Sequence, residues 1–168
     1  MAEGEGAVSL KWIIVSVGKI REDYLRRGVF DYLTRLKPYV SIELIEGLEV
    51  NIGSKATLAE IRKGVVEEGR RILDKVRRED ILVALDEKGR LMDSLELAEW
   101  LQAAICQGKG RVVVVIGGPN GLADEVKKRA DLVLSLSRLT FPHQMAVLIW
   151  VEQLYRCLRI MRGEPYHK

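Results

Sequence analysis

The chain has 168 residues, of which 48% are hydrophobic and 30% charged, and its net charge is +3. This composition excludes a disordered or fibrous chain and is typical of one globular domain with a sizeable core. The weak positive charge is compatible with a nucleic-acid partner but does not indicate one. Every apolar run is far shorter than the roughly 18 residues of a membrane span, so no membrane partner is expected.

The first six residues are acidic and rich in glycine. They lack the positive charge and the apolar stretch of a secretory signal. We therefore expect a cytoplasmic protein with a flexible extension over residues 1–9 and a single domain over residues 10–168. Cys106 and Cys157 show no metal-ligand spacing with each other or with the two histidines, so we expect buried free thiols and no metal.

Hydrophobic periodicity predicts strands and helices in strict alternation. Thr57 and Glu60 have the spacing of a capping box, Asp93 or Ser94 is expected to cap a later helix, and residues 87–90 are expected to form a turn. The predicted strands are 10–17, 40–48, 80–86, 112–116 and 132–134. The predicted helices are 22–36, 57–76, 93–104, 124–129 and 144–162. This order predicts an α/β fold with a mostly parallel sheet and helices on both faces.

Two loops follow buried strands near the middle of this pattern. The first is Gly-Gly-Pro-Asn-Gly at 117–121, and the second spans residues 135–143. Adjacent loops at the carboxyl ends of parallel strands form a crevice where α/β proteins bind ligands. The first loop matches neither the dinucleotide fingerprint nor the phosphate loop, and a plain tight turn is the alternative.

The second loop carries free backbone groups, because Pro142 disfavours helix at Phe141. Together with its leucines, such a loop suits an adenine and a ribose. The alternative is a structural connection with Leu136 and Phe141 in the core. On sequence alone His143 is more often a cap or surface residue than a catalyst, and Arg156, Arg159 and Arg162 are more often a solvated helix face.

The final predicted helix is apolar around most of its circumference. One sheet face cannot cover so wide an apolar surface, which predicts a homodimer built on this helix. The apolar residues are Ala146, Val147, Leu148, Ile149, Trp150, Val151, Leu154 and Leu158.

Four motifs in order resemble one family, the bacterial 23S rRNA pseudouridine N3-methyltransferases. They are VIGGPNGL at 115–122, LSLSRLTFPHQ at 134–144, EQLYR at 152–156 and PYHK at 165–168. The resemblance implies a SPOUT-class fold with a deep C-terminal trefoil knot, a homodimer, and S-adenosylmethionine bound in the knot. It also implies methylation of N3 of a pseudouridine in 23S rRNA on the assembled ribosome.

Motif matching also implies roles for particular residues. The catalytic candidates are His143, Tyr166 and His167, with the base left open between the histidines and solvent, and the tail of one subunit could complete the other's site. RNA contacts are expected from Arg138, Arg156 and Lys168. The cofactor contacts are expected from Leu85, Gly117, Leu136, Ser137, Arg138, Leu139, Thr140 and Phe141.

One position departs from the family pattern. The family has an arginine four residues after the histidine of the Pro-His pair, on a face that looks toward the site, whereas this chain has Val147. If the protein is active, Arg138 is the first candidate to replace that cation. An alternative function is a SPOUT-like dimer that binds RNA or ribosomes with little or no methyl transfer. A third is an unrelated Rossmann-like enzyme acting on a small nucleotide.

Overall fold

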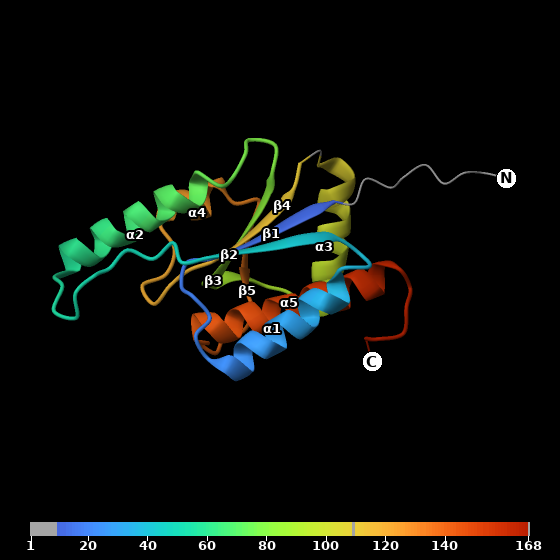
Figure 1. Cartoon of the computed structure of the whole chain (residues 1–168). Helices are drawn as coiled ribbons and strands as arrows, with labels where there is room; N and C mark the ends of the chain where they lie inside the picture. The colour runs from blue at the N-terminus through green and yellow to red at the C-terminus, as the bar shows by residue number, and fades with distance from the viewer. Residues whose placement is uncertain (1–9, 109, 168) are drawn as a thin grey trace.

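A computed structural model describes residues 10–108 and 110–167, so the extension over residues 1–9 and Lys168 lie outside it. Strands and helices alternate strictly, as the sequence predicts (Figure 1). The strands are β1 (Lys11–Ser16), β2 (Ser41–Glu46), β3 (Ile81–Leu91), β4 (Val112–Ile116) and β5 (Leu132–Ser135). The helices are α1 (Asp23–Leu36), α2 (Leu58–Leu73), α3 (Ser94–Gln107), α4 (Asp124–Arg129) and α5 (His143–Met161).

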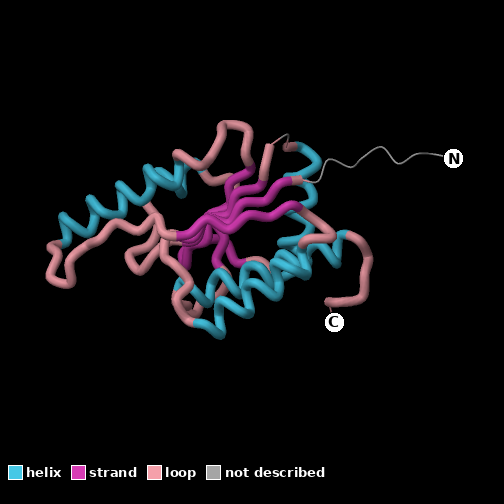
Figure 2. The backbone as a smooth tube through the Cα atoms, viewed as in Figure 1, coloured by secondary structure: helices cyan, strands magenta, loops and turns pink. Residues whose placement is uncertain are grey.

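The five strands form one sheet in the order β2-β1-β4-β3-β5, and every pairing is parallel. Helices cover both faces, with α1, α3 and α5 on one side and α2 and α4 on the other (Figures 1 and 2). Successive strand residues point to opposite faces, so Trp12 and Ile14 join the first core while Ile13 and Val15 join the second. The predicted fold class is confirmed as an all-parallel α/β sheet.

Side-chain caps fix the starts of two helices. Thr57 and Glu60 form the predicted capping box of α2, and Asp93, rather than Ser94, caps α3 with Glu96 in the same arrangement. Each box satisfies two amides that a helix start leaves unpaired. Local sequence located both helix starts because all partners lie within three residues, although it left the cap of α3 open between Asp93 and Ser94.

Strand β3 runs further than the sequence predicts. Residues 87–90, expected as a turn, lie within it as an irregularity, because Leu134 of β5 pairs with both Leu85 and Arg90. A Cβ on Gly89 would lie 2.6 Å from the carbonyl carbon of Leu134, so only glycine allows this approach. The partner strand lies some 45 residues later in the chain, which is why local pattern missed the extension.

Helix α5 lies between α1 and α3 and packs on the sheet (Figures 1 and 2). Val147, Trp150, Val151 and Leu154 are fully buried inside this single chain. The sequence argument for a dimer was therefore wrong in its reason, because α1 and α3 cover most of the apolar circumference that was assigned to a second subunit.

The two cysteines differ in environment. Cys157 on α5 is buried as predicted, and its burial raises the pKa of the thiol to about 12. Cys106 near the end of α3 is exposed, contrary to the prediction, because its position faces away from the sheet. Within the described ranges no cluster of three metal-ligating side chains occurs, and no helix there is long and apolar enough to cross a membrane.

Candidate functional site

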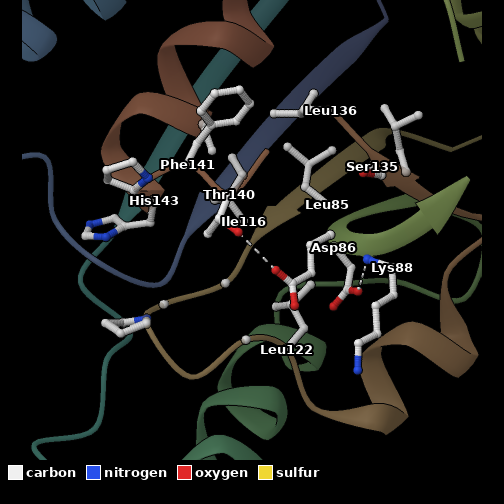
Figure 3. A pocket seen from close by; sticks show the side chains of 18 of the residues that line it. Leu85, Asp86, Lys88, Ile116, Leu122, Ser135, Leu136, Thr140, Phe141 and His143 are labelled. Atoms are coloured by element: carbon white, nitrogen blue, oxygen red, sulfur yellow. Dashed lines mark hydrogen bonds between the residues drawn. The ribbon is translucent and has the colours of Figure 1, made fainter. Parts of the chain in front are cut away.

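A pocket of about 840 Å³ opens beside residues 85–88, in the middle of β3, and at the carboxyl ends of β4 and β5. The loops after β4 and β5 form much of its wall, as the crevice rule for parallel sheets predicts, and residues 85–88 of β3 form the rest (Figure 3). His143 lines the pocket, whereas Arg138 is exposed on the loop outside it. The predicted cofactor residues that do line it are Leu85, Gly117, Leu136, Ser137, Leu139, Thr140 and Phe141.

Serine side chains fix the loop that follows β5. Ser135 Oγ donates to the carbonyl oxygen of Ser137 at 2.9 Å, and Ser137 Oγ accepts from the amide of Leu139 at 3.0 Å. These bonds within residues 135–139 take the place of the backbone hydrogen bonds of a helix or strand. The segment is therefore not helical, as the position of Pro142 predicts. The loop therefore combines apolar side chains with backbone polar groups around one pocket.

The loop after β4 is a tight turn that folds back on itself. Gly121 has a φ of +79° and donates its amide to the carbonyl of Gly118 at 3.1 Å. A Cβ on Gly117 would lie 3.0 Å from the carbonyl carbon of Gly121 and 3.1 Å from Leu122 Cγ. A side chain at position 117 would therefore crowd the close approach of the two ends of this loop.

Charged residues at the pocket mouth were missed in the sequence. Glu87 Oε2 accepts a long hydrogen bond of 3.4 Å from Thr140 Oγ1, which joins β3 to the loop after β5 (Figure 3). Asp86 lies 3.6 Å from the ammonium of Lys127 and accepts from the amide of Lys88 at 2.9 Å. Asp86 and Glu87 could have been assigned to the site from their position directly after Leu85, where the buried part of β3 ends.

His143 is the first residue of α5, and its ring lies against the loop after β1. Its Nε2 is 3.3 Å from the carbonyl oxygen of Lys19. A carbonyl oxygen only accepts, so a hydrogen bond here uses the proton of Nε2, and in the neutral ring Nδ1 then carries the lone pair. The ring packs directly on Gly18, a residue that sequence reasoning did not assign to the site.

Gln144 ties the start of α5 to the start of α1. Its Oε1 accepts from the amides of Arg21 at 2.7 Å and Glu22 at 3.0 Å. The side chain of Glu22, at the N-cap of α1, makes no capping bond of its own. Gln144 therefore satisfies amides that this helix start would leave unpaired, and it fixes the position of His143.

Tyr166, His167 and Arg156 lie together at the opposite end of α5, away from the pocket. The ring centroid of Tyr166 is 4.9 Å from that of Tyr155, and Arg156 lies over the Tyr166 ring. Arg156 and Arg159 are partly buried against tyrosines, so they are not the solvated face that their spacing suggested. The structure brings together the cofactor residues with His143, and the tail residues with Arg156, but it does not join these two groups.

Position 147 does not face the pocket. Val147 is fully buried in the core beneath α5, whereas the neighbouring Ala146 lines the pocket. Four residues along a helix advance the side chain by somewhat more than one turn, about 40° past His143, and here that rotation carries it toward the sheet. The expectation that this position shares the site-facing side of His143 was wrong for this chain.

Comparison with known protein families gives the class of this protein, a methyltransferase of the SPOUT class. A family model described as "Predicted SPOUT methyltransferase" matches residues 10–167, and the chain belongs to this family. The resemblance drawn from the four motifs is thus confirmed, and an unrelated Rossmann-like enzyme is ruled out.

Similar proteins narrow the class further. The chain is 48% identical to "Ribosomal RNA large subunit methyltransferase H" of Syntrophomonas wolfei, over 95% of this chain and 100% of that one. It is 44% identical to the protein of the same name from Carboxydothermus hydrogenoformans, over 92% and 98%. A solved structure of a probable methylase family protein from Haemophilus influenzae shares the fold, with a TM-score of 0.50 and 14% identity, covering 94% of this chain and 70% of that one.

Proposed function

We propose that this protein transfers a methyl group from S-adenosylmethionine to N3 of a pseudouridine in 23S rRNA of the assembled ribosome. The carrying observation is the near full-length identity of 40–48% to enzymes named as large-subunit rRNA methyltransferases. In a bacterium this substrate places the enzyme in the cytoplasm. The family match and the names of the relatives favour this function over a dimer that binds without methyl transfer.

The pocket fits the proposed cofactor in size and chemistry. Its volume of about 840 Å³ lies within the usual range for small-molecule sites. Leu85 and Leu136 offer apolar surface for an adenine, and the backbone of residues 136–141 offers donors and acceptors for a nucleoside. Asp86 and Glu87 suit the positive charge of a sulfonium compound. Bound there, S-adenosylmethionine supplies an electrophilic methyl group.

His143 is our candidate for the base that removes the N3 proton. Because its Nε2–H donates to Lys19, the Nδ1 lone pair is the atom able to accept a proton. Gly18 and Gln144 hold the residue in place from two sides. Holding the base and the cofactor pocket in one fixed geometry is the main contribution that the protein makes to such a reaction.

Completion of the site requires a second copy of the chain in this proposal. Tyr166 and His167 lie at the far end of α5 from His143, so a partner's tail would have to supply them. Burial, together with the hydrogen bonds that the Tyr166 hydroxyl makes with Tyr32 and Glu152, raises the pKa of Tyr166, which keeps it a neutral phenol suited to stacking or hydrogen bonding. The exposed aromatic side chains of Tyr24 and Phe30 on α1 offer further surface to a partner.

Two further elements complete the proposal. The trefoil knot expected from the family belongs to this proposal. Arg138 is exposed on the cofactor loop, where its guanidinium can bind an RNA phosphate while its backbone borders the pocket.

The test is methyl transfer from labelled S-adenosylmethionine to ribosomes from a strain that lacks the modification. We expect incorporation into 23S rRNA of ribosomes, located by mass spectrometry at one pseudouridine, and much less into protein-free rRNA. His143→Gln should lower kcat with cofactor affinity kept, and Arg138→Ala should raise KM for ribosomes. Cofactor binding without any transfer by the wild-type protein would contradict the proposal, and a monomer in sedimentation at micromolar concentration would contradict the shared site.

A further inference from the structure

The C-terminal segment, residues 163–167, is folded back onto the end of α5 by several anchors. Gly163, with a φ of +65°, reverses the chain and donates its amide to the carbonyl of Ile160 at 2.9 Å. The Glu164 carboxylate lies 2.8 Å from Arg159 Nε and accepts from the Tyr39 hydroxyl at 2.7 Å. These contacts define the path of the tail before it reaches Tyr166.

The next anchor is the Glu152–Arg156 pair, one turn apart on α5. Arg156 Nε and Nη2 donate to Glu152 Oε1 at 3.1 and 2.5 Å. The same carboxylate oxygen accepts from the Tyr166 hydroxyl at 3.2 Å, and the Arg156 guanidinium lies 4.8 Å from the centre of the Tyr166 ring. The pair therefore holds Tyr166 by both its hydroxyl and its ring face.

Arg156 also reaches the last described residue. Its Nη1 lies 3.4 Å from His167 Nδ1. A guanidinium only donates hydrogen bonds, so Nδ1 must carry the lone pair and the ring proton must sit on Nε2. His167 thus turns an N–H donor outward, whereas the Nδ1 of His143 keeps a free lone pair. Both histidines thus carry the proton on Nε2, but His143 uses that proton in its contact with Lys19, whereas His167 turns it outward as a donor.

We propose that Glu152 and Arg156 are positioning residues that hold the tail in a preformed shape, with His167 fixed as an Nε2–H donor to an oxygen of the RNA. This inference rests on the proposed function. The acceptor is either a phosphate or a carbonyl oxygen of the target base, where negative charge develops as the N3 proton leaves. His167 is then a hydrogen-bond donor rather than the base.

The contacts of Arg156 favour this role over a direct RNA contact. Its Nε and Nη2 donate to Glu152, its Nη1 reaches His167, and its face covers Tyr166. A tail that is ordered in advance loses less conformational freedom when it meets its target, so the assembled site forms at lower cost.

The kinetic test compares Arg156→Gln, Arg156→Lys and Glu152→Gln in the full protein acting on ribosomes. Arg156→Gln and Glu152→Gln should lower kcat/KM by about 100-fold, the cost of a catalytic group displaced by about 1 Å. Arg156→Lys should be intermediate, because one ammonium cannot replace the fork that serves both Glu152 and His167. Calorimetric affinity for S-adenosylmethionine should stay within about twofold, since the pocket lies at the other end of α5.

Arg70→Gln is the matched control. Arg70 also pairs with a carboxylate on its own helix, Glu67, but on α2, across the sheet from the tail. Its activity should equal that of wild type. Arg156→Gln activity equal to that of Arg70→Gln would overturn the inference.

The tautomer has its own test. Nitrogen-15 NMR of labelled His167 should show the Nε2–H form in wild type and a mixture in Arg156→Gln. His167→Gln, which keeps a donor near the Nε2 position, should retain more activity than His167→Asn. If His167→Asn raises only the KM for ribosomes, the acceptor is a phosphate. If it lowers kcat, the acceptor is the carbonyl oxygen of the target base.

An Nδ1–H tautomer in wild type, or equal activity of His167→Gln and His167→Asn, would overturn the assignment. The NMR measurement does not depend on turnover. If the wild-type enzyme transfers no methyl group, the proposed function fails, and the spectrum of His167 still decides whether Arg156 positions the tail.

Discussion

The imidazole of His143 rests on the Cα of Gly18, where the Cβ of any other residue would overlap the ring. Gly18→Ala should push the ring away and break its hydrogen bond to Lys19. We expect kcat for methyl transfer to fall by about 100-fold, because the base is displaced while the cofactor loops are untouched. Calorimetry should show nearly unchanged affinity for S-adenosylmethionine.

Gly53→Ala is the control for this prediction. A Cβ at Gly53 meets no atom within 4 Å, and its φ is not in the left-handed region. Kinetics and thermal stability of this variant should match wild type. Full activity of Gly18→Ala would show that His143 does not act from this position.

Gly117→Val should abolish cofactor binding. The new Cβ would lie 3.0–3.1 Å from Gly121 and Leu122, so the loop after β4 must open at the pocket wall. Isothermal titration with S-adenosylmethionine should show no heat of binding, while circular dichroism confirms a folded protein. A folded variant with wild-type affinity would remove this loop from the cofactor site.

Val147→Arg should destabilise the protein rather than restore the family's cation at the site. The side chain at this position is fully buried in the core beneath α5. Burying an unpaired guanidinium there should lower the free energy of unfolding by about 3 kcal/mol or more. Urea denaturation measures the loss, and a variant as stable as wild type but faster in methyl transfer would contradict the prediction.

Asp80 and Arg111 form a pair whose contribution depends on pH. Burial by itself would raise the pKa of Asp80, but hydrogen bonds from the Arg111 side chain and from the amides of Arg77 and Arg111 outweigh it and lower the pKa. The folded protein therefore binds this proton less tightly than the unfolded chain. Its stabilising effect is complete above the ordinary aspartate pKa, about pH 4, and is lost as the pH falls through the lower folded value.

Asp80→Asn should lower the free energy of unfolding at pH 7 by about 2–4 kcal/mol, because Arg111 is left without its charged partner. The difference from wild type should shrink as the pH falls below 4. Urea unfolding across this range is the measurement. Methyl transfer under stabilising conditions should be unaffected. Asp80 and Arg111 lie at the amino ends of β3 and β4, whereas the pocket lies toward the carboxyl ends of the strands. A constant difference at all pH values would contradict the assignment.

Local patterns predicted much of the fold because their causes are local. The capping box at Thr57, the buried run of β4 and the helical spacing of α5 each depend on neighbours within a few residues. The order of strands, the extension of β3 to Leu91 and the covering of α5 by α1 and α3 depend on distant segments. The hydrophobic periodicity of one segment cannot predict which distant segment will pack or pair with it.

The candidate site shows the same division. Gly117 and the segment 136–141 follow strands, so the crevice rule placed them at one pocket. Gly18 also follows a strand, but only the fold shows that His143 packs on it. Tyr166 and His167 could be matched to a motif, yet the motif does not contain the contacts with Glu152 and Arg156 that direct the tail away from its own pocket.

The pairing of β1 with β4 has a consequence for the synthesis of the chain. These strands are neighbours in the sheet but lie about 100 residues apart in sequence. The amides of Arg21 and Glu22 at the start of α1 likewise donate to Gln144, which is synthesised more than 100 residues later. Contacts between residues so far apart in the chain form slowly during folding, because the long intervening segment loses entropy when its ends meet. The first hundred residues to emerge during translation therefore have no finished core, and we expect folding to be completed only after α5 has been released.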